Sequence, residues 1–123
     1  MEPFQYVAKI DLNYHYNFEE SFIKPIKPIL NIMSFPPKKQ GLLTNGYQTY
    51  GNLFDSGYEG IQEVEEIIRS EVEKYRTSFE RSGEGFITHW PNEYNLVGWL
   101  VSIKSGGKLN PHMHENGWLS GSI

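Results

Sequence analysis

The spacing of apolar residues predicts one long amphipathic helix, from Gly60 to about Phe79. Apolar side chains recur there at intervals of three and four residues, which places them on one face of a helix. This stripe consists of Ile61, Val64, Ile68, Val72 and Tyr75, with Ile67 beside it. Most of the glutamates lie off the stripe. We interpret them as the solvated outer face of a helix that covers a sheet, rather than as a binding site for a partner.

The N-terminal part of the chain contains signals for a strand and for a broken helix. Phe4 to Leu12 alternates loosely between apolar and polar residues and is rich in β formers, so we expect a strand at a sheet edge. Asn17 is a suitable helix cap, and the two glutamates that follow favour the positive end of a helix dipole. Pro25 and Pro28 each remove a backbone donor. This helix is therefore expected to be kinked or in two parts and to end near Met33.

Turn signals and apolar runs outline the rest of the chain. Phe35 to Lys39 is expected to be a loop, and Asn45-Gly46 is a turn signal. Leu96 to Ile103 is the strongest strand signal, and its nearly continuous apolar character predicts burial on both faces, between helix and sheet. Ser105 to Gly107 predicts a turn, and Trp118 to Ile123 predicts the start of another strand.

This order of elements indicates a single but partial α+β domain, residues 1–123. Residues 1–95 form a front half of helices and loops, and residues 96–123 begin a sheet. A sheet that starts so late in the chain needs more strands to cover its faces and pair its edges. We therefore expect the chain to be a fragment or a naturally shortened version of a longer protein, and we expect its unfinished sheet to favour a homo-oligomer.

Composition excludes several classes of protein. The chain has 123 residues, a length typical of one domain, and a formal net charge of −4 without a block of basic residues, so the charge pattern of a nucleic-acid-binding protein is missing. The absence of cysteine excludes a disulfide framework, a thiolate metal site and a cysteine nucleophile. The first residues lack the pattern of a signal peptide, and no apolar run approaches the roughly 20 residues of a membrane span. We therefore expect a cytoplasmic protein that does not insert into membranes.

His112 and His114 are the residues best placed to hold a metal ion. Residues i and i+2 point to the same face of an extended segment, whereas on a helix they would not face each other. Pro111 pushes Asn110 towards extended geometry and so argues against a helix through the pair. The sequence therefore predicts two imidazoles side by side on one face of a strand or strand edge. Imidazole suits iron, copper, nickel and zinc.

Four interpretations of this histidine pair are open on the residues alone. An iron(II) centre of the facial-triad type would combine the two histidines with a carboxylate. In a cupin-like site, Gly106, five further residues and the pair match the start of the cupin pattern, but Leu119 and its neighbours stand where a glutamate is expected. Zinc-dependent hydrolysis would need a third ligand and a water-activating base. The fourth interpretation is a pair of polar histidines in a turn, without a metal.

Two longer segments resemble a known enzyme family. The first, Trp99 to Gly121, combines a tryptophan-bearing strand, a glycine turn, a P-H-x-H segment and an L-S-G sequence. The second, Gly46 to Phe54, looks like the pattern G-x-Q-T-x-G-N-L-F. Together, with an amphipathic helix between them, they resemble the 2-oxoglutarate- and iron(II)-dependent oxygenases. The resemblance covers Gly46 to Ile123 well and the preceding residues only in outline.

The resemblance implies a double-stranded β-helix (jelly roll) with helices packed on one sheet. It also implies Fe(II) at the barrel mouth, 2-oxoglutarate as co-substrate, and hydroxylation of a C–H bond. His112 matches the first metal ligand of the family, and His114 matches the second, where most of these oxygenases have a carboxylate. The distal histidine and the basic residue that binds 2-oxoglutarate come late in such folds. Neither follows His114, so the two histidines would form half a site.

Four further polar residues are candidates for binding the cofactor or co-substrate. Asn110 and Asn116 flank the histidine pair, either as hydrogen-bond donors to the ligand or as turn formers. Ser120 stands at the start of the expected last strand, where it either contacts a ligand or forms a hydrogen bond with a nearby backbone group. Gln48 belongs to the second matched segment, where it lines a pocket or takes part in local hydrogen bonds. The tryptophans on either side of the pair are expected in the core.

Two readings outside the oxygenases are also open. A non-catalytic cupin-like or interaction domain would use the histidines structurally. A degenerate remnant would have no activity. The sequence leaves the substrate open between a protein side chain, a small metabolite and a nucleobase, because specificity lies in loops and in the part of the fold that is missing.

Overall fold

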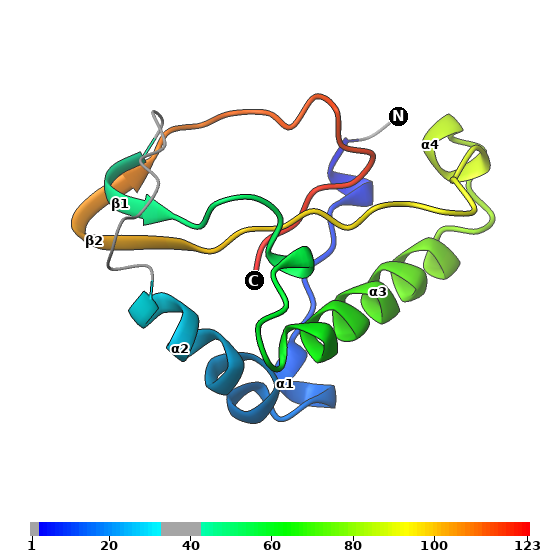
Figure 1. Cartoon of the computed structure of the whole chain (residues 1–123). Coiled ribbons are helices and arrows are strands. Elements are labelled where there is room, and N and C mark those ends of the chain that lie inside the picture. Colours follow the sequence, from blue (N-terminus) through cyan, green and yellow to red (C-terminus); the bar gives the residue numbers. More distant parts are fainter. Residues whose placement is uncertain (1–2, 33–42) are drawn as a thin grey trace.

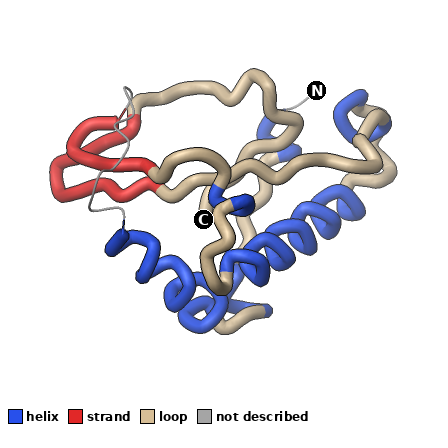
Figure 2. The backbone as a smooth tube through the Cα atoms, viewed as in Figure 1, coloured by secondary structure: helices blue, strands red, loops and turns tan. Residues whose placement is uncertain are grey.

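In a computed structural model of the chain, residues 3–32 and 43–123 form helices and a small antiparallel sheet (Figures 1 and 2). The expected mixed helical and sheet class is therefore confirmed. The predicted helix end near Met33 and the predicted loop from Phe35 to Lys39 lie outside the described residues. Within the ranges given above, no helix is long and apolar enough to cross a membrane.

The predicted strand from Phe4 to Leu12 is wrong, because this segment lies against helices instead of at a sheet edge. The 3-10 helix η1, Pro3–Tyr6, is followed by unpaired chain and by the short helix α1, Leu12–His15. The hydroxyl of Tyr75 donates to the carbonyl of Tyr6 at 2.6 Å. A backbone acceptor that a sheet would use is therefore bound by a side chain, which shows how strongly β propensity depends on context.

The predicted broken helix is present. Its first part is the π-helical segment η2, Glu19–Ile23, which continues directly into α2, Lys24–Ile32. The side-chain oxygen of Asn17 accepts the backbone N–H of Glu20 at 3.2 Å, so Asn17 is the expected cap. The first residue of α2 donates its N–H to the carbonyl of the first residue of η2, five positions earlier. This wider turn comes directly before Pro25, where a proline ring would crowd the carbonyl of an ordinary α-helical turn.

The predicted amphipathic helix is confirmed as α3, Ile61–Ser78. It begins after Gly60, whose φ of 83° is left-handed and where a Cβ atom would lie 2.6 Å from the Cβ of Pro25. The buried stripe of α3 packs on Phe22 of η2 and on the 3-10 helix η3, Leu53–Asp55. The stripe therefore contacts other helices, and not the sheet that the sequence led us to expect. Three ion pairs between residues three or four positions apart lie along the helix, as expected for a solvated face.

Two clusters of buried side chains form the core. They consist of Phe22, Val64 and Ile67, and of Ile29, Leu53 and Ile61. Phe54 packs against both clusters and joins them. Phe22 is 1 % exposed, and complete burial of such a side chain stabilises the fold by about 1.5–3 kcal/mol. The core therefore lies where η2, α2, α3 and η3 meet (Figure 1).

The sheet consists of two antiparallel strands, β1, Leu43–Gln48, and β2, Val101–Leu109. The last residue of β1 pairs with the first of β2, and the first of β1 pairs with the last of β2. Between these ends, Asn45 lies opposite the segment Lys104 to Gly107, so the ladder contains a large bulge. The φ angle is 52° at Asn45 and 78° at Gly106. The two predicted turn signals therefore lie opposite each other within this bulge, and neither ends its strand.

The predicted strand from Leu96 to Ile103 is correct only in its last part. β2 begins at Val101, and residues 96–100 lie outside the ladder. The side chains of Thr49 and Asn52 bind the backbone of these residues in place of a neighbouring strand. The predicted burial on both faces is also wrong, since Val97 is 60 % exposed and Ile103 is 46 % exposed. Leu100, by contrast, packs against the buried cluster of Ile29, Leu53 and Ile61.

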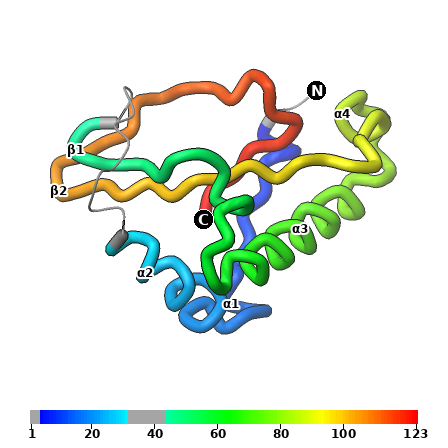
Figure 3. The backbone as a smooth tube through the Cα atoms, in the orientation of Figure 1, coloured from blue at the N-terminus to red at the C-terminus, as the bar shows by residue number. Residues whose placement is uncertain are grey.

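The chain beyond β2 returns across the molecule. Figure 3 shows the orange and red segment running from the sheet towards α4, Gly85–Thr88, and then back past the middle of the chain. The predicted strand from Trp118 to Ile123 is wrong, because these residues are irregular and exposed. Of the expected sheet, the described residues therefore contain β1 and β2, and these two strands do not by themselves form a jelly roll.

Candidate metal site

His112 and His114 lie beside each other in the segment that follows β2. Their ring centroids are 4.9 Å apart, and the ring planes meet at 84°, an edge-to-face arrangement. The expectation that the two imidazoles are side by side is therefore met. The expectation of a strand is wrong at this point, because β2 ends at Leu109, which pairs with the first residue of β1. We call residues 110–118 the histidine loop.

One hydrogen bond sets the ring orientation of His112. Its Nδ1 atom lies 2.8 Å from the backbone carbonyl oxygen of Asn110. A carbonyl oxygen only accepts, so Nδ1 must carry the proton in this bond. The neutral imidazole then has its lone pair on Nε2, which is the arrangement of a metal-binding histidine held by a carbonyl group. Asn110, predicted to contact a ligand with its side chain, thus contributes its backbone.

The histidine loop is attached to the rest of the molecule through two tryptophans. The ring of Trp99 lies 5.5 Å from the ring of His114, centroid to centroid. On the other side of the pair, the indole N–H of Trp118 donates to the carbonyl of Phe86 in α4 at 3.0 Å. Trp99 is 38 % exposed and Trp118 is 50 % exposed, so the prediction that both belong to the core is wrong. Sequence reasoning missed the contact of Trp99 with His114 and the bond of Trp118 to α4, although both tryptophans flank the motif in the sequence.

Asn116 belongs to a turn within the same loop. The backbone N–H of Gly117 donates to the carbonyl of His114 at 3.0 Å and closes a turn around Glu115 and Asn116. This agrees with the interpretation of Asn116 as a turn former. Ser120 is exposed in irregular chain beyond the turn, and not at the start of a strand. The structure thus brings Asn110, His112, His114 and Asn116 together on one loop.

Gln48 lies in the sheet and not on the histidine loop. It is the last residue of β1, pairs with Val101 and is 9 % exposed. Its side-chain oxygen is buried without a hydrogen-bond partner. An unsatisfied buried acceptor costs about 1–3 kcal/mol. Gln48 therefore presents an unmet acceptor inside the second matched segment, which is the chemistry expected of a residue that binds a donor group.

The donor set of the histidine pair fits part of a metal centre. Two neutral imidazoles are suitable ligands for iron(II), nickel, cobalt or zinc. Across residues 3–32 and 43–123, no group of three or more histidine, cysteine, aspartate or glutamate side chains is arranged to hold a metal ion. The pair could therefore supply two ligands to an ion but not a complete coordination sphere.

The basic residues nearest to the histidine loop in sequence, Lys104 and Lys108 of β2, bear on whether 2-oxoglutarate could bind there. That co-substrate needs a basic group for its far carboxylate. Lys104 precedes the histidine loop in β2, but its ammonium group lies over the ring of Tyr47, 5.5 Å from the centroid. Its position thus matches a cation–π contact in the sheet.

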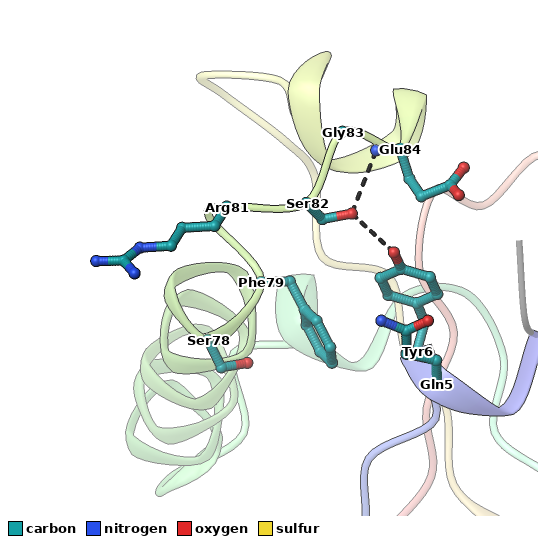
Figure 4. Close-up of a pocket in the computed structure, with 8 residues that line it drawn as sticks. All are labelled: Gln5, Tyr6, Ser78, Phe79, Arg81, Ser82, Gly83 and Glu84. Carbon is teal, nitrogen blue, oxygen red and sulfur yellow. Dashed lines mark hydrogen bonds between the residues drawn. The ribbon is translucent and has the colours of Figure 1, made fainter.

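A second polar site lies at the end of α3, away from the histidine motif. It is an open hollow of about 480 Å³ between η1 and residues 78–84 (Figure 4). The hydroxyl groups of Tyr6 and Ser82 are 2.7 Å apart, and the Ser82 hydroxyl also accepts the N–H of Glu84 at 3.2 Å. The side chain of Arg81 points away from these hydroxyls in Figure 4. The hydroxyls are thus engaged with protein groups, and the histidine pair is the stronger candidate for chemistry.

Comparisons with known proteins give no match that bears on this site. No known protein family, no curated protein and no solved structure matches the chain. The resemblance to the 2-oxoglutarate-dependent oxygenases therefore stays a prediction that rests on the two sequence segments. The finding that the two imidazoles are adjacent comes from the geometry of the histidine loop.

Proposed function

We propose that this chain belongs to an Fe(II)- and 2-oxoglutarate-dependent oxygenase of the double-stranded β-helix type, in which His112 and His114 bind the metal ion. The observation that carries the proposal is the pair of adjacent imidazoles, 4.9 Å apart between centroids, with one ring held by a backbone carbonyl. The two sequence segments that resemble the family support the choice of iron(II) and of an oxygenase.

Each described residue has a limited part in the proposed centre. The Nε2 atom of His112 is free to bind because Nδ1 is engaged with the carbonyl of Asn110. His114 is the second ligand, and Trp99 limits the positions its ring can take. Bound iron(II) would activate dioxygen, the oxidant, for C–H hydroxylation, with 2-oxoglutarate decarboxylated to succinate as the co-substrate. The third ligand and the group that binds 2-oxoglutarate are to be sought outside the described residues or in a second chain.

The competing proposal is a non-catalytic cupin-like or interaction domain whose histidines are structural. The edge-to-face packing of the two rings favours it, because aromatic pairs of this kind stabilise a loop without a metal. It predicts that neither Fe(II) nor another divalent ion changes the spectrum or the stability of the protein.

Anaerobic metal titration separates the two proposals. We expect the wild-type chain to bind Co(II) and Fe(II), and binding by His112→Ala or His114→Ala to be weaker by at least about tenfold. His89→Ala is the matched control, since Nδ1 of His89 also lies 3.0 Å from a backbone carbonyl oxygen, that of Gly85. Equal affinity in all four proteins would exclude the site.

Addition of 2-oxoglutarate to the Fe(II)-loaded chain then tests the family. A metal-to-ligand charge-transfer band, absent from His112→Ala, would support the oxygenase proposal. Metal binding without such a band would leave a metal site and remove the evidence for this co-substrate.

A further inference from the structure

The segment that matches G-x-Q-T-x-G-N-L-F, Gly46 to Phe54, forms hydrogen bonds with the backbone on both sides of Trp99. Thr49 makes two of the contacts. Its backbone N–H donates to the carbonyl of Leu100 at 3.0 Å, and its hydroxyl oxygen accepts the N–H of Leu100 at 2.9 Å. Both backbone groups of Leu100 are thus bound to one residue.

Asn52 makes the corresponding contacts on the other side of Trp99. Its side-chain oxygen accepts the N–H of Gly98 at 3.0 Å, and its amide nitrogen donates to the carbonyl of Leu96 at 3.0 Å. The N–H of Leu53 donates to the carbonyl of Gly98 at 2.8 Å. The backbone groups of Gly98 are therefore both bound as well.

These contacts need the residue types that the segment provides. Residues 96–100 lie outside the two-stranded ladder, so their backbone groups depend on other partners. An asparagine side chain both accepts and donates, as the two bonds of Asn52 require. Gly98 has no side chain, and a Cβ there would lie 2.5 Å from the Phe54 ring. The chain is thus held close to the matched segment at both neighbours of Trp99.

We propose that Thr49 and Asn52 are positioning residues for the histidine pair, and that they act through Trp99. They fix the backbone at Gly98 and Leu100, which sets the direction of the Cα–Cβ bond of the intervening Trp99. That side chain lies against the ring of His114, 5.5 Å between centroids. The inference rests on the proposed metal site, and it gives this segment a role in ordering the ligands instead of in binding substrate.

The test compares variants of Thr49 and Asn52 with matched controls. Thr49→Val removes the acceptor for Leu100 while keeping the shape of the side chain, and Thr49→Ser restores the acceptor. Asn52→Ala removes both side-chain bonds to the segment, and it also removes the cap of η3 that the Asn52 side chain provides at the N–H of Phe54. Asn95→Ala is the control, because Asn95 is an exposed asparagine next to the gripped residues. Co(II) affinity, the unfolding midpoint and paramagnetic broadening of the Trp99 indole signal are measured for each protein.

We expect Thr49→Val and Asn52→Ala to weaken Co(II) binding roughly tenfold and to reduce the broadening at Trp99. Thr49→Ser and Asn95→Ala should behave like the wild type. If Asn52→Ala does not fold, the comparison of valine with serine at position 49 carries the test. Variants that unfold more easily but keep the Co(II) affinity and the broadening would overturn this inference alone. A wild-type chain that does not bind Co(II) would overturn the proposed function, and with it this inference.

Discussion

Helix α3 and the histidine loop are held in place by different kinds of interaction. Ile61, Val64 and Ile67 of α3 are buried in two clusters that also contain side chains of η2, α2 and η3. Every residue of the histidine loop is exposed, and the loop is attached through the Trp99 ring contact and the Trp118 hydrogen bond. Stability is thus concentrated in one region and the candidate chemistry in the other.

This difference is informative about how a site can be built on a small fold. Many apolar contacts together stabilise the core, so the position of α3 does not depend on any one hydrogen bond. The histidine loop has few contacts, so each of them has a large effect on the geometry of the two rings. Loops with few buried contacts open at low free-energy cost, and a bound metal ion would add the missing constraint.

The largest effect is expected from a substitution in the core. Phe22→Ala removes a side chain that is 1 % exposed and stacks on Phe18. The free energy of unfolding should fall by about 3–5 kcal/mol, as for other large-to-small changes of buried aromatic residues. Urea denaturation followed by circular dichroism measures this change. His112→Ala, the comparison from the exposed loop, should stay within about 0.5 kcal/mol of the wild type.

The reverse result would contradict the proposed division between the regions. If His112→Ala destabilised the metal-free chain as much as Phe22→Ala, the histidines would be a structural part of the fold. The non-catalytic interpretation of the pair would then be preferred.

A smaller effect is expected when the loop loses its hydrogen bond to α4. Trp118→Phe keeps an aromatic ring but removes the indole N–H that donates to Phe86. The global free energy of unfolding should fall by about 0.5–1.5 kcal/mol. The rate of hydrogen exchange should increase more at the N–H of Gly117, which closes the turn at His114, than at the backbone amides of α3. An increase of equal size in both regions would mean that the loop and the core unfold together.

Local periodicity was sufficient to predict the helices near the core. The stripe of α3 and the cap at Asn17 follow from residues a few positions apart, and both are present. The strand expected from Phe4 to Leu12 fails because a distant residue, Tyr75, binds the backbone there. The apolar run from Leu96 to Ile103 fails in its first part because Thr49 and Asn52 replace a neighbouring strand.

For the candidate site too, local features could be predicted from the sequence and long-range contacts could not. The i, i+2 spacing, together with the extended geometry expected before Pro111, placed the rings of His112 and His114 side by side, because both signals concern neighbouring residues. The bond between Trp118 and Phe86 joins residues far apart in sequence, and no local pattern indicates it. The same holds for the buried, unpartnered oxygen of Gln48, since burial depends on the whole packing of the sheet.

The smallest expected effect is the pH dependence of stability that arises from Glu71 of α3. The Tyr16 hydroxyl donates to Glu71 at 2.8 Å, and the Lys74 ammonium donates to the same carboxylate oxygen at 3.0 Å. Partial burial by itself would raise the pKa of Glu71, but these bonds and the charge of Lys74 together lower it below 4.5. The ionised form is therefore favoured by folding. Its contribution to stability is present above pH 4.5, and it is lost as the pH falls through the lowered pKa of the folded state.

Glu71→Gln tests this contribution without changing the shape of the side chain. The variant should lose no more than about 1 kcal/mol at neutral pH, because Lys74 is exposed, and its stability should fall less than that of the wild type on acidification below pH 4.5. Urea midpoints measured from pH 7 to 3 give both values. Glu73→Gln, which removes the exposed pair of Glu73 with Arg76 at 3.5 Å, is the matched control and should shift the neutral midpoint less. If the urea midpoints of Glu71→Gln and the wild type fell in parallel on acidification, the charge of Glu71 would not contribute to stability. The hydrogen bond from Tyr16 would then account for the contribution of this side chain, as packing and neutral hydrogen bonds do elsewhere in the helical region.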